Sequence, residues 1–328
     1  MHIAILGGTG FIGSALRQEL LNQGHRVRII SRRAHFSHPN GPISYAQWSL
    51  PSPSPNPYAN PYASPDTNPA SAHQSLAKHL AHVDAVINLA GAGIADARWS
   101  MARKNILITS RVKTTAALAA ALQSLPDDSR PHTVLQASAV GYYGNWATMT
   151  TAPTCHEYRP VGDDFLAQLC LQWENAIKIH ELAKLGTRVA IMRFAPVLER
   201  NGGMLARLIP PFTYYMGGSL GSGHQPLPWI HLHDAVAAML YLLQHPHLHG
   251  PFNFTAPQAI SMAQFCSALG HALNRPSWFR IPAPLLQVAL GELAESTILR
   301  GQIAPPERLS QGGFHARFDT IEKAFENL

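Results

Sequence analysis

Seven residues near the start of the chain carry the clearest chemical signal. Gly7 to Gly13 read Gly-Gly-Thr-Gly-Phe-Ile-Gly, after the apolar run Ile3 to Leu6 and before a helical pattern. Glycines let the backbone turn tightly and approach a diphosphate closely, and the first amides of the following helix can donate to phosphate oxygens. The dinucleotide-binding spacing is met by Gly8, Gly10 and Gly13, and a variant of it by Gly7, Gly10 and Gly13. The context of strand, glycine turn and helix therefore predicts a dinucleotide site.

A second group of residues bears on which dinucleotide is bound. In such folds an acidic residue about 20 positions beyond the glycines binds the ribose hydroxyl of NAD, whereas an arginine accommodates the 2′-phosphate of NADP. Here Ser31, Arg32 and Arg33 follow a predicted strand over 26–30, and the acid is missing. A solvated charge pair at the end of a strand is the simpler alternative. The position favours NADP.

The elements that must position these residues alternate along the chain. Strands are expected at about 3–6, 26–30, 43–48, 85–89, 133–137 and 188–193, and helices at about 11–22, 74–80, 101–122 and 164–185. Such alternation is typical of the α/β class and predicts a Rossmann-type, doubly wound parallel sheet. Ala90 and Gly91 follow the fourth of these strands, and small residues there let a cofactor lie against the backbone.

The second half of the chain changes in character. Glycine and proline are frequent after residue 196, and helical segments follow at about 263–273 and 283–299. We expect an NADP-binding domain over 1–198 and a smaller, mostly helical substrate lobe over 199–328, with 225–256 returning to the Rossmann core. Residues 50–70 are rich in Pro, Ser, Asn and Ala, a composition typical of a disordered surface insertion.

Composition narrows the function further. The 328 residues carry a formal charge of +6, but the basic residues are scattered and do not alternate with aromatics, so we expect an anionic cofactor and no nucleic acid. The apolar runs are too short to span a bilayer, and the chain begins directly with a strand, so we expect no membrane contact and no signal peptide. The cysteines are Cys155, Cys170 and Cys266. Three widely spaced thiols favour a reducing cytoplasm and no metal site.

Motifs along nearly the whole chain now permit a comparison. They include Gly7 to Gly13, NLAG at 88–91, SAVGYYG at 138–144, GDDFLAQLCLQWE at 162–174, and GSGHQ with WIH and Asp over 221–234. Together they resemble the extended short-chain dehydrogenase/reductase superfamily, and more narrowly its atypical sugar-nucleotide-epimerase-like branch, the YfcH type, with its C-terminal module. Only the proline-rich insertion lies outside the match.

The resemblance implies a set of NADP contacts. Arg111 and Val197 enter through the resemblance alone, because composition would make Arg111 a solvated helix charge. With the glycine turn and the strand ends, the candidate cofactor-binding residues are Gly7, Thr9, Gly10, Phe11, Ile12, Gly13, Ser31, Arg32, Leu89, Ala90, Gly91, Arg111 and Val197.

Catalysis is the point at which the chain departs from the superfamily. Standard members use a Ser together with a Tyr and a Lys, whose charge lowers the pKa of the phenol so that it can transfer a proton. Ser138 matches the serine, but Leu166 and Cys170 stand where Tyr and Lys belong. Leucine has no proton to give, and a thiol supplies no fixed cation, so Cys170 is most simply a buried apolar residue. The atypical branch shares this departure.

Substitutes for the missing pair are available. Tyr142 or Tyr143 could serve as acid/base beside Ser138, or both could simply pack the turn, and we take Tyr142 with Ser138 as the candidate catalytic pair. Trp229 and His231 are candidate substrate residues. Asp163, Asp164 and Glu174 could participate, although acids that open a helix usually cap it.

These residues lead to two functional hypotheses. The first is an NADP-dependent oxidoreductase or epimerase-like enzyme whose substrate is small and polar, with a sugar nucleotide as the class that the resemblance implies. The alternative is an NADP-binding redox sensor or scaffold without turnover, which the missing Tyr and Lys favour. The number of subunits stays open.

Overall fold

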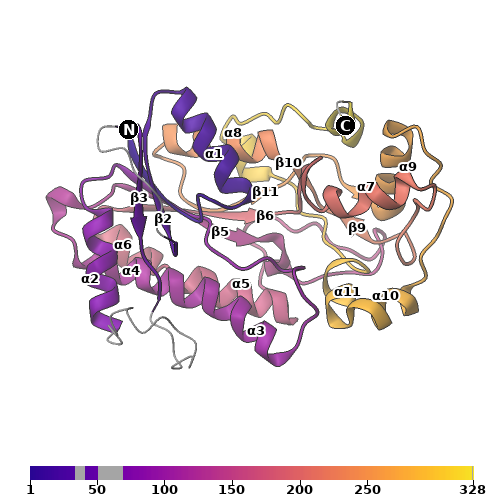
Figure 1. Cartoon of the computed structure of the whole chain (residues 1–328), viewed down its shortest axis with the longest axis horizontal. Helices are drawn as coiled ribbons and strands as arrows, with labels where there is room; N and C mark the ends of the chain where they lie inside the picture. Colours follow the sequence, from indigo (N-terminus) through magenta and orange to yellow (C-terminus); the bar gives the residue numbers. More distant parts are fainter. Residues whose placement is uncertain (34–40, 51–68, 327) are drawn as a thin grey trace. The chain divides into compact units, whose positions relative to one another are not determined.

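The computed structural model describes residues 1–33, 41–50, 69–326 and 328 (Figure 1). A seven-stranded parallel sheet has the strand order β11-β6-β5-β4-β1-β2-β3. Its strands are β1 (His2–Leu6), β2 (Arg26–Ser31), β3 (Ile43–Gln47), β4 (Ala85–Asn88), β5 (Thr133–Ala139), β6 (Arg188–Phe194) and β11 (Gly250–Phe254). Residues 51–68, where most of the predicted insertion falls, lie outside the described residues. The predicted Rossmann-type sheet is confirmed.

The central strands owe their position to continuous apolar runs. Ile3, Ala4 and Ile5 of β1 and Val86 and Ile87 of β4 are fully buried. Parallel strands covered on both faces carry such runs, whereas half-exposed strands alternate polar and apolar residues. The strand order reverses between β1 and β4, and the crevice at such a reversal is where ligands bind in open α/β sheets.

The chain divides by its contacts into two compact units. The first comprises residues 1–91, 108–136 and 173–189, and the second residues 92–107, 137–172 and 190–328. This division is distinct from the predicted split into a cofactor domain and a substrate lobe, which stays a prediction.

In the first unit, helices cover both faces of the strands. Helix α1 (Phe11–Asn22) lies on one face, and α2 (Pro69–Leu80), α4 (Thr114–Ser124) and α6 (Ile179–Lys184) lie on the other (Figure 1). The bounds of α1 are those predicted, because its apolar stripe, with Leu16 and Leu20 fully buried, and the glycines around it point to the same limits. Helices on both faces make the sheet doubly wound.

Three helices predicted as continuous are interrupted. The segment 101–122 consists of α3 (Met101–Ile108), a π-helical turn at Thr109–Lys113, and α4. The segment 164–185 breaks after α5 (Phe165–Ala176) at Lys178, whose φ is 57°, and the segment 283–299 breaks at Gly291, whose φ is 61°. A left-handed residue cannot continue a right-handed helix, so the predictions of one helix over 164–185 and over 283–299 were wrong. The segment 101–122 is helical throughout, with the π-helical turn inside it.

The second unit contains the C-terminal helices and two small sheets. It holds most of α3 and of α5, and its C-terminal helices are α7 (Leu205–Thr213), α8 (Leu232–Gln244), α9 (Met262–Ala272), α10 (Ala283–Leu290), α11 (Glu292–Thr297), α12 (Glu307–Gln311) and α13 (Ile321–Phe325). One small sheet joins β10 (Ile230–His231), β7 (Val197–Glu199) and β8 (Gly202–Gly203), and the other joins β12 (Ile260–Ser261) and β9 (Pro226–Leu227). Phe212, Trp229 and Phe265 anchor a shared apolar core, and the C-terminal region is mostly helical, as predicted.

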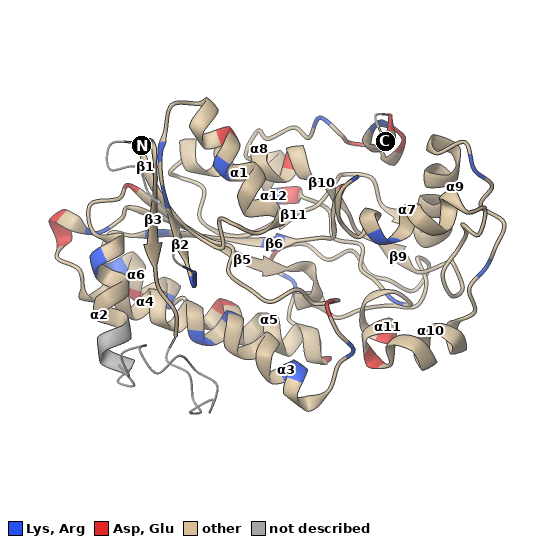
Figure 2. Ribbon diagram, in the orientation of Figure 1, with Lys and Arg blue, Asp and Glu red and all other residues tan. Residues whose placement is uncertain are grey.

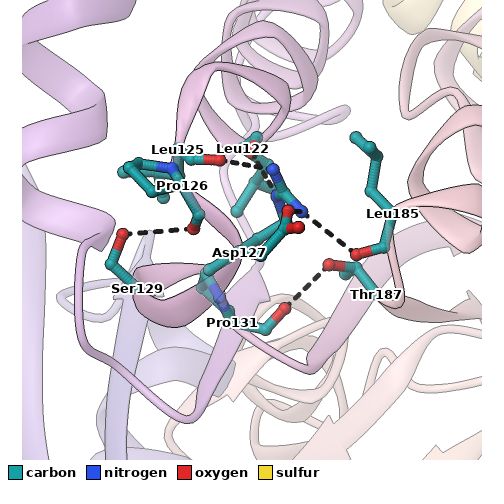
Figure 3. Close-up of polar contacts among 9 residues, drawn as sticks. Leu122, Leu125, Pro126, Asp127, Ser129, Pro131, Leu185 and Thr187 are labelled. Atoms are coloured by element: carbon teal, nitrogen blue, oxygen red, sulfur yellow. Dashed lines mark hydrogen bonds and ion pairs between the residues drawn. The ribbon is translucent and has the colours of Figure 1, made fainter.

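A buried arginine connects the loop after α4 with the loop before β6 in the first unit. The guanidinium of Arg130, which is 7% exposed, donates to the carbonyls of Leu122, Leu125 and Leu185 and pairs with Asp127. Figure 3 shows the loop residues around these contacts, together with the hydrogen bond from Thr187 Oγ1 to the carbonyl of Pro131 at 2.8 Å. The end of α4 is thereby tied to the segment that leads into β6.

The charged residues of the described part of the chain are distributed over many elements. Figure 2 shows Lys and Arg spread over many elements and interspersed with Asp and Glu. Among the residues described, no helix combines the length and the apolar character needed to cross a membrane. Within the same residues, His, Cys, Asp and Glu form no group suited to hold a metal ion.

Candidate functional site

The glycine turn over 7–13, which we call the glycine cradle, leaves no room for side chains at two of its positions. Gly7 has a φ of 82°, and its carbonyl accepts a hydrogen bond from the amide of Gly10 at 3.0 Å. A Cβ on Gly13 would lie 2.3 Å from the Gly7 carbonyl oxygen, and one on Gly7 would lie 2.8 Å from the Leu89 carbonyl. Such contacts are too short for any side chain to be accommodated without a backbone shift. The turn requires glycine at both positions.

Helix α1 presents an open N-terminus beside this turn. Gly10 is its N-cap and provides no side-chain cap, and the first turn has no acidic residue. Thr9, Gly10 and Phe11 are exposed. The first amides of a helix have no partner within the helix, and the helix dipole adds partial positive charge at this end. The sequence Gly10-Phe11-Ile12-Gly13 thus offers donors to an anion.

The end of β4 lies directly beside the end of β1. Leu6 pairs with Asn88, and the amide of Leu89 donates to the Leu6 carbonyl at 2.9 Å. The turn over 89–91 therefore borders the glycine cradle. Two groups of candidate residues that are far apart in the sequence come together here within the first unit.

A buried polar network supports the turn over 89–91. Asn88 Nδ2 donates to Thr115 Oγ1 at 3.1 Å and to Gln136 Oε1 at 2.9 Å, while Asn88 Oδ1 accepts from the amide of Ala90 at 3.2 Å. Trp173 Nε1 also donates to Thr115 Oγ1, at 3.0 Å. Buried polar groups that are fully paired rigidify their surroundings. Sequence reasoning missed this network, although the NLAG motif contains Asn88.

Arg111 approaches the same turn from the π-helical segment. Its side chain is only 8% exposed, and its guanidinium carbon lies 5.1 Å from the ring centroid of Trp173. A Cβ on Gly91 would lie 3.1 Å from that carbon. The interpretation from composition, a solvated helix charge, was wrong, because the π-helical turn directs the side chain inward. Single π-turns occur often at functional sites.

The end of β2 carries the third group of candidates in the first unit. Ser31 is the last residue of β2, and its hydroxyl accepts from the amide of Arg33 at 3.2 Å. Arg32 and Arg33 are exposed. Since β2 pairs in parallel with β1, the residues that follow both strands emerge at the same edge of the sheet. A hydroxyl and two cations therefore lie along the edge that bears the glycine turn.

The candidate catalytic pair belongs to the second unit. Ser138 is near the end of β5 and is 3% exposed, and Tyr142 lies in a short 3₁₀ turn, Val140–Tyr143. Tyr142 is half-buried, and its ring faces that of Tyr143 edge-on at a centroid distance of 5.5 Å. The guanidinium carbon of Arg193 lies 3.6 Å from the Tyr142 ring centroid. Sequence reasoning missed Arg193.

Tyr143 is engaged in the core of the second unit. Its hydroxyl donates to Asn253 Oδ1 at 2.7 Å and accepts from Arg193 Nη1 at 2.9 Å. The side chain is 2% exposed. Of the two tyrosines that were alternatives, Tyr143 is built into the fold and Tyr142 is the more accessible.

The helix that carries the standard Tyr and Lys elsewhere in the superfamily is α5. Leu166 packs against Gly141, where a Cβ would lie 3.4 Å from that of the leucine, and Cys170 is 4% exposed. Asp164 caps the helix, because its Oδ1 accepts from the amide of Ala167 at 2.9 Å, and burial raises its pKa. Asp163 is exposed, and Glu174 is 9% exposed.

Val197, Trp229 and His231 come together in the second unit. Val197 pairs with Ile230 across β7 and β10, which places it beside the candidate substrate residues. Trp229 is 1% exposed, and its indole N–H has no hydrogen-bond partner among the described residues. His231 Nδ1 accepts from the amide of His233 at 3.1 Å, so the proton of the neutral imidazole sits on Nε2. Burial lowers the pKa of His231.

Comparisons with known proteins agree with the resemblance seen in the sequence. The profile of the NAD dependent epimerase/dehydratase family matches residues 3–253, and that of a domain of unknown function, DUF1731, matches residues 281–328. An epimerase family protein of Mycobacterium bovis is 38% identical over 322 residues, which cover 98% of this chain and 95% of the relative.

Two solved structures are similar to the chain. The human epimerase family protein SDR39U1, crystallised with NADPH, has a TM-score of 0.81 at 30% identity, with all of both chains covered. A nucleoside-diphosphate sugar epimerase from Corynebacterium glutamicum has a TM-score of 0.70 at 25% identity, covering 99% of this chain and 57% of that one. The chain therefore belongs to the NAD-dependent epimerase/dehydratase family and carries a C-terminal module of the DUF1731 type.

Proposed function

We propose that the protein is an NADP-dependent oxidoreductase or epimerase-like enzyme that acts on a small polar substrate, with a sugar nucleotide as the favoured class. The glycine cradle carries this proposal. Gly7 and Gly13 leave no room for side chains beside the open N-terminus of α1, which suits the diphosphate of a dinucleotide. The human relative crystallised with NADPH and the sugar nucleotide epimerase of similar fold support the choice of ligand and substrate.

The residues proposed to hold NADP come from several strand ends. Amides of the glycine turn and of α1 would bind the diphosphate, and Ser31 and Arg32 would bind the 2′-phosphate. The remaining contacts are proposed for Leu89, Ala90, Gly91, Arg111 and Val197. We retain 1–198 as the cofactor domain and 199–328 as the substrate lobe, with 225–256 returning to the Rossmann core.

Bound NADP would supply hydride exchange with the substrate. For the proton that accompanies it, we assign the hydroxyl of Tyr142, with Ser138 as the hydrogen-bonding residue beside the substrate oxygen. Trp229 offers an indole N–H that has no partner in the described part of the chain, and His231 offers an imidazole Nε2–H; both could orient a polar substrate. The three cysteines are all buried, which is consistent with a cytoplasmic protein.

A second candidate function follows from α5. Leu166 and Cys170 stand where the superfamily has its Tyr and Lys, so the standard proton-transfer pair is missing from that helix. This favours an NADP-binding redox sensor or scaffold without turnover.

One experiment separates the two functions. NADPH binding is measured first, and a panel of sugar nucleotides and small carbonyl compounds is then offered while nicotinamide absorbance and product epimers are followed. Turnover that is lost in the Ser138→Ala, Tyr142→Phe double variant supports the enzyme and its site. Turnover that survives in the double variant contradicts the site, and tight NADPH binding without turnover of any compound favours the scaffold.

A further inference from the structure

Because the standard lysine is missing, another residue must supply the positive charge beside the catalytic phenol. A phenol that exchanges protons near neutral pH needs a fixed positive charge close to it, because the charge favours the phenolate. Position 170 offers only a thiol that is 4% exposed. Among the described residues of the second unit, Arg193 of β6 is a cation that stacks on a candidate catalytic side chain.

Arg193 is fixed by hydrogen bonds from its guanidinium. Its Nη1 donates to Tyr143 Oη at 2.9 Å and to the Glu157 carbonyl at 2.8 Å. Tyr143 is itself held, since its hydroxyl donates to Asn253 Oδ1 at 2.7 Å. Arg193 is 3% exposed, so its charge is shielded from bulk water and acts strongly on its neighbours. The arginine is a preorganised cation.

The guanidinium of Arg193 also stacks on the ring of Tyr142. The guanidinium carbon lies 3.6 Å from the Tyr142 ring centroid and 5.1 Å from that of Tyr143. A cation over an aromatic face is attracted to the ring, and more strongly when the ring bears a negative charge. The Tyr143 hydroxyl is engaged by Asn253 and Arg193 in the core, so Tyr142 is the more accessible tyrosine beside this cation.

Two other titratable groups described near Tyr142 and Arg193, Cys155 and Glu157, carry no positive charge. Cys155 packs in the same cluster, and burial raises the pKa of its thiol to about 11, so it is neutral. Glu157 turns its carboxylate to the amides of Asn253 and Arg308, at 3.2 Å and 3.1 Å. Among the described residues stacked on the Tyr142 ring, the charged one is Arg193.

We propose that Arg193 is a positioning residue that orients the Tyr142 ring and stabilises its phenolate, from β6 rather than from α5. In this arrangement Tyr142 Oη gives its proton to, or takes it from, the substrate oxygen, and Arg193 contributes charge without touching the substrate. The proposal rests on the proposed function for the role of Tyr142 in turnover. The electrostatic coupling between the two residues can be tested without any substrate.

The test is a difference titration of tyrosinate absorbance in the near ultraviolet. Subtracting the Tyr142→Phe variant from the wild type isolates Tyr142, and subtracting Tyr214→Phe isolates an exposed tyrosine as the reference. We expect the Tyr142 midpoint about 1–2 pH units below the reference. Arg193→Gln should raise the midpoint to the reference or above it, and Arg193→Lys should give an intermediate value because it keeps the charge but not the planar stack.

Two controls make the outcome decisive. Arg159→Gln removes another cation of the second unit, which lies over Trp146 at 5.8 Å, and should leave the Tyr142 midpoint unchanged. Thermal unfolding reports whether each variant folds, and the wild-type comparison of Tyr142 with Tyr214 needs no arginine variant. A wild-type midpoint equal to the reference, or one unmoved in folded Arg193→Gln, overturns the proposal. Coupling without turnover of any substrate would instead leave Arg193 in place and contradict the proposed function.

Discussion

The ring of Phe318 stacks on the imidazole of His231, with centroids 3.9 Å apart and ring planes at 30°. Phe318 belongs to the C-terminal module, and its amide donates to Asp234 Oδ2 at 2.8 Å, while the amide of Arg317 donates to Asp234 Oδ1 at 3.0 Å. Asp234 is 1% exposed in the first turn of α8. The module therefore covers one face of a candidate substrate residue and helps to keep it neutral.

This burial predicts a pH dependence of stability. Burial is the largest cause of the lowered pKa of His231, and His233 and Arg317 lower it further, against the opposing effects of Asp234 and Glu199. Below the ordinary pKa of about 6.5, the unfolded chain binds a proton that the folded chain does not. The stabilisation is therefore present above that value and is lost as the pH falls towards the folded pKa.

His231→Asn is the variant that tests this dependence, because it retains an acceptor at the N-cap of α8. Its melting temperature should fall less than that of the wild type between about pH 7.5 and pH 5. His249→Asn, at an exposed position, is the matched control. The pKa values of His2, His25 and His79 are also lowered, so part of the wild-type decline should persist. An equal decline in His231→Asn and the wild type would contradict the prediction.

Coenzyme preference is predicted to depend on the end of β2. NADPH should bind more tightly than NADH by about 1–3 kcal/mol, because we propose a charge-assisted contact between Arg32 and the 2′-phosphate. Arg32→Asp should reverse the preference in calorimetric titrations. Arg26→Asp makes the same charge change at the opposite end of the strand and should leave the preference intact. Equal dissociation constants for both coenzymes in the wild type would refute the assignment.

Arg111 is predicted to contribute to NADPH affinity. Arg111→Met should weaken binding about tenfold or more, since a hydrogen bond to a charged group contributes about 1.5–3 kcal/mol. Lys113→Met removes a charge from an exposed position of the same helical turn and should change the dissociation constant little. If Arg111→Met has the same dissociation constant for NADPH as Lys113→Met, the prediction is wrong.

Substitutions at the candidate catalytic positions and at Cys170 should affect turnover differently. Ser138→Ala and Tyr142→Phe should each lower any NADP-dependent turnover by about 10²–10⁴-fold, the range typical of general acid–base groups. Cys170→Ala should not abolish turnover, because a buried thiol contributes packing rather than charge. Steady-state rates on a substrate found in the panel measure all three. A loss confined to Cys170→Ala would move the site to α5.

Local patterns predicted those parts of the fold in which local and tertiary preferences agree. The glycine turn, α1 and the buried strands are of this kind, because glycine spacing and apolar runs determine both the local structure and its packing. The resemblance to the epimerase-like branch rested on motifs at the strand ends, and the family is confirmed. The assignment of individual site residues stays a prediction.

The features that sequence reasoning missed depend on contacts between distant segments. Arg193 looks like an ordinary polar residue in a strand, and only the approach of the 3₁₀ turn at 140–143 places it under Tyr142. The burial of Arg111 follows from the π-helical turn at Thr109–Lys113, which the residue types there do not predict. The break between α5 and α6 was not predicted because the left-handed residue there is Lys178 and not glycine, the residue that usually takes this conformation.

The π-helical turn at Thr109–Lys113 has a consequence for insertions and deletions. One residue corresponds to about 100° of rotation in an α-helix, and a π-turn accommodates a residue that a regular helix would not. Deleting one residue there would restore a regular helix and rotate either Arg111 away from Gly91 or Thr115 away from Asn88. The number of residues between Arg111 and Thr115 is therefore constrained. Homologous chains should differ here in residue type but should carry no insertion or deletion.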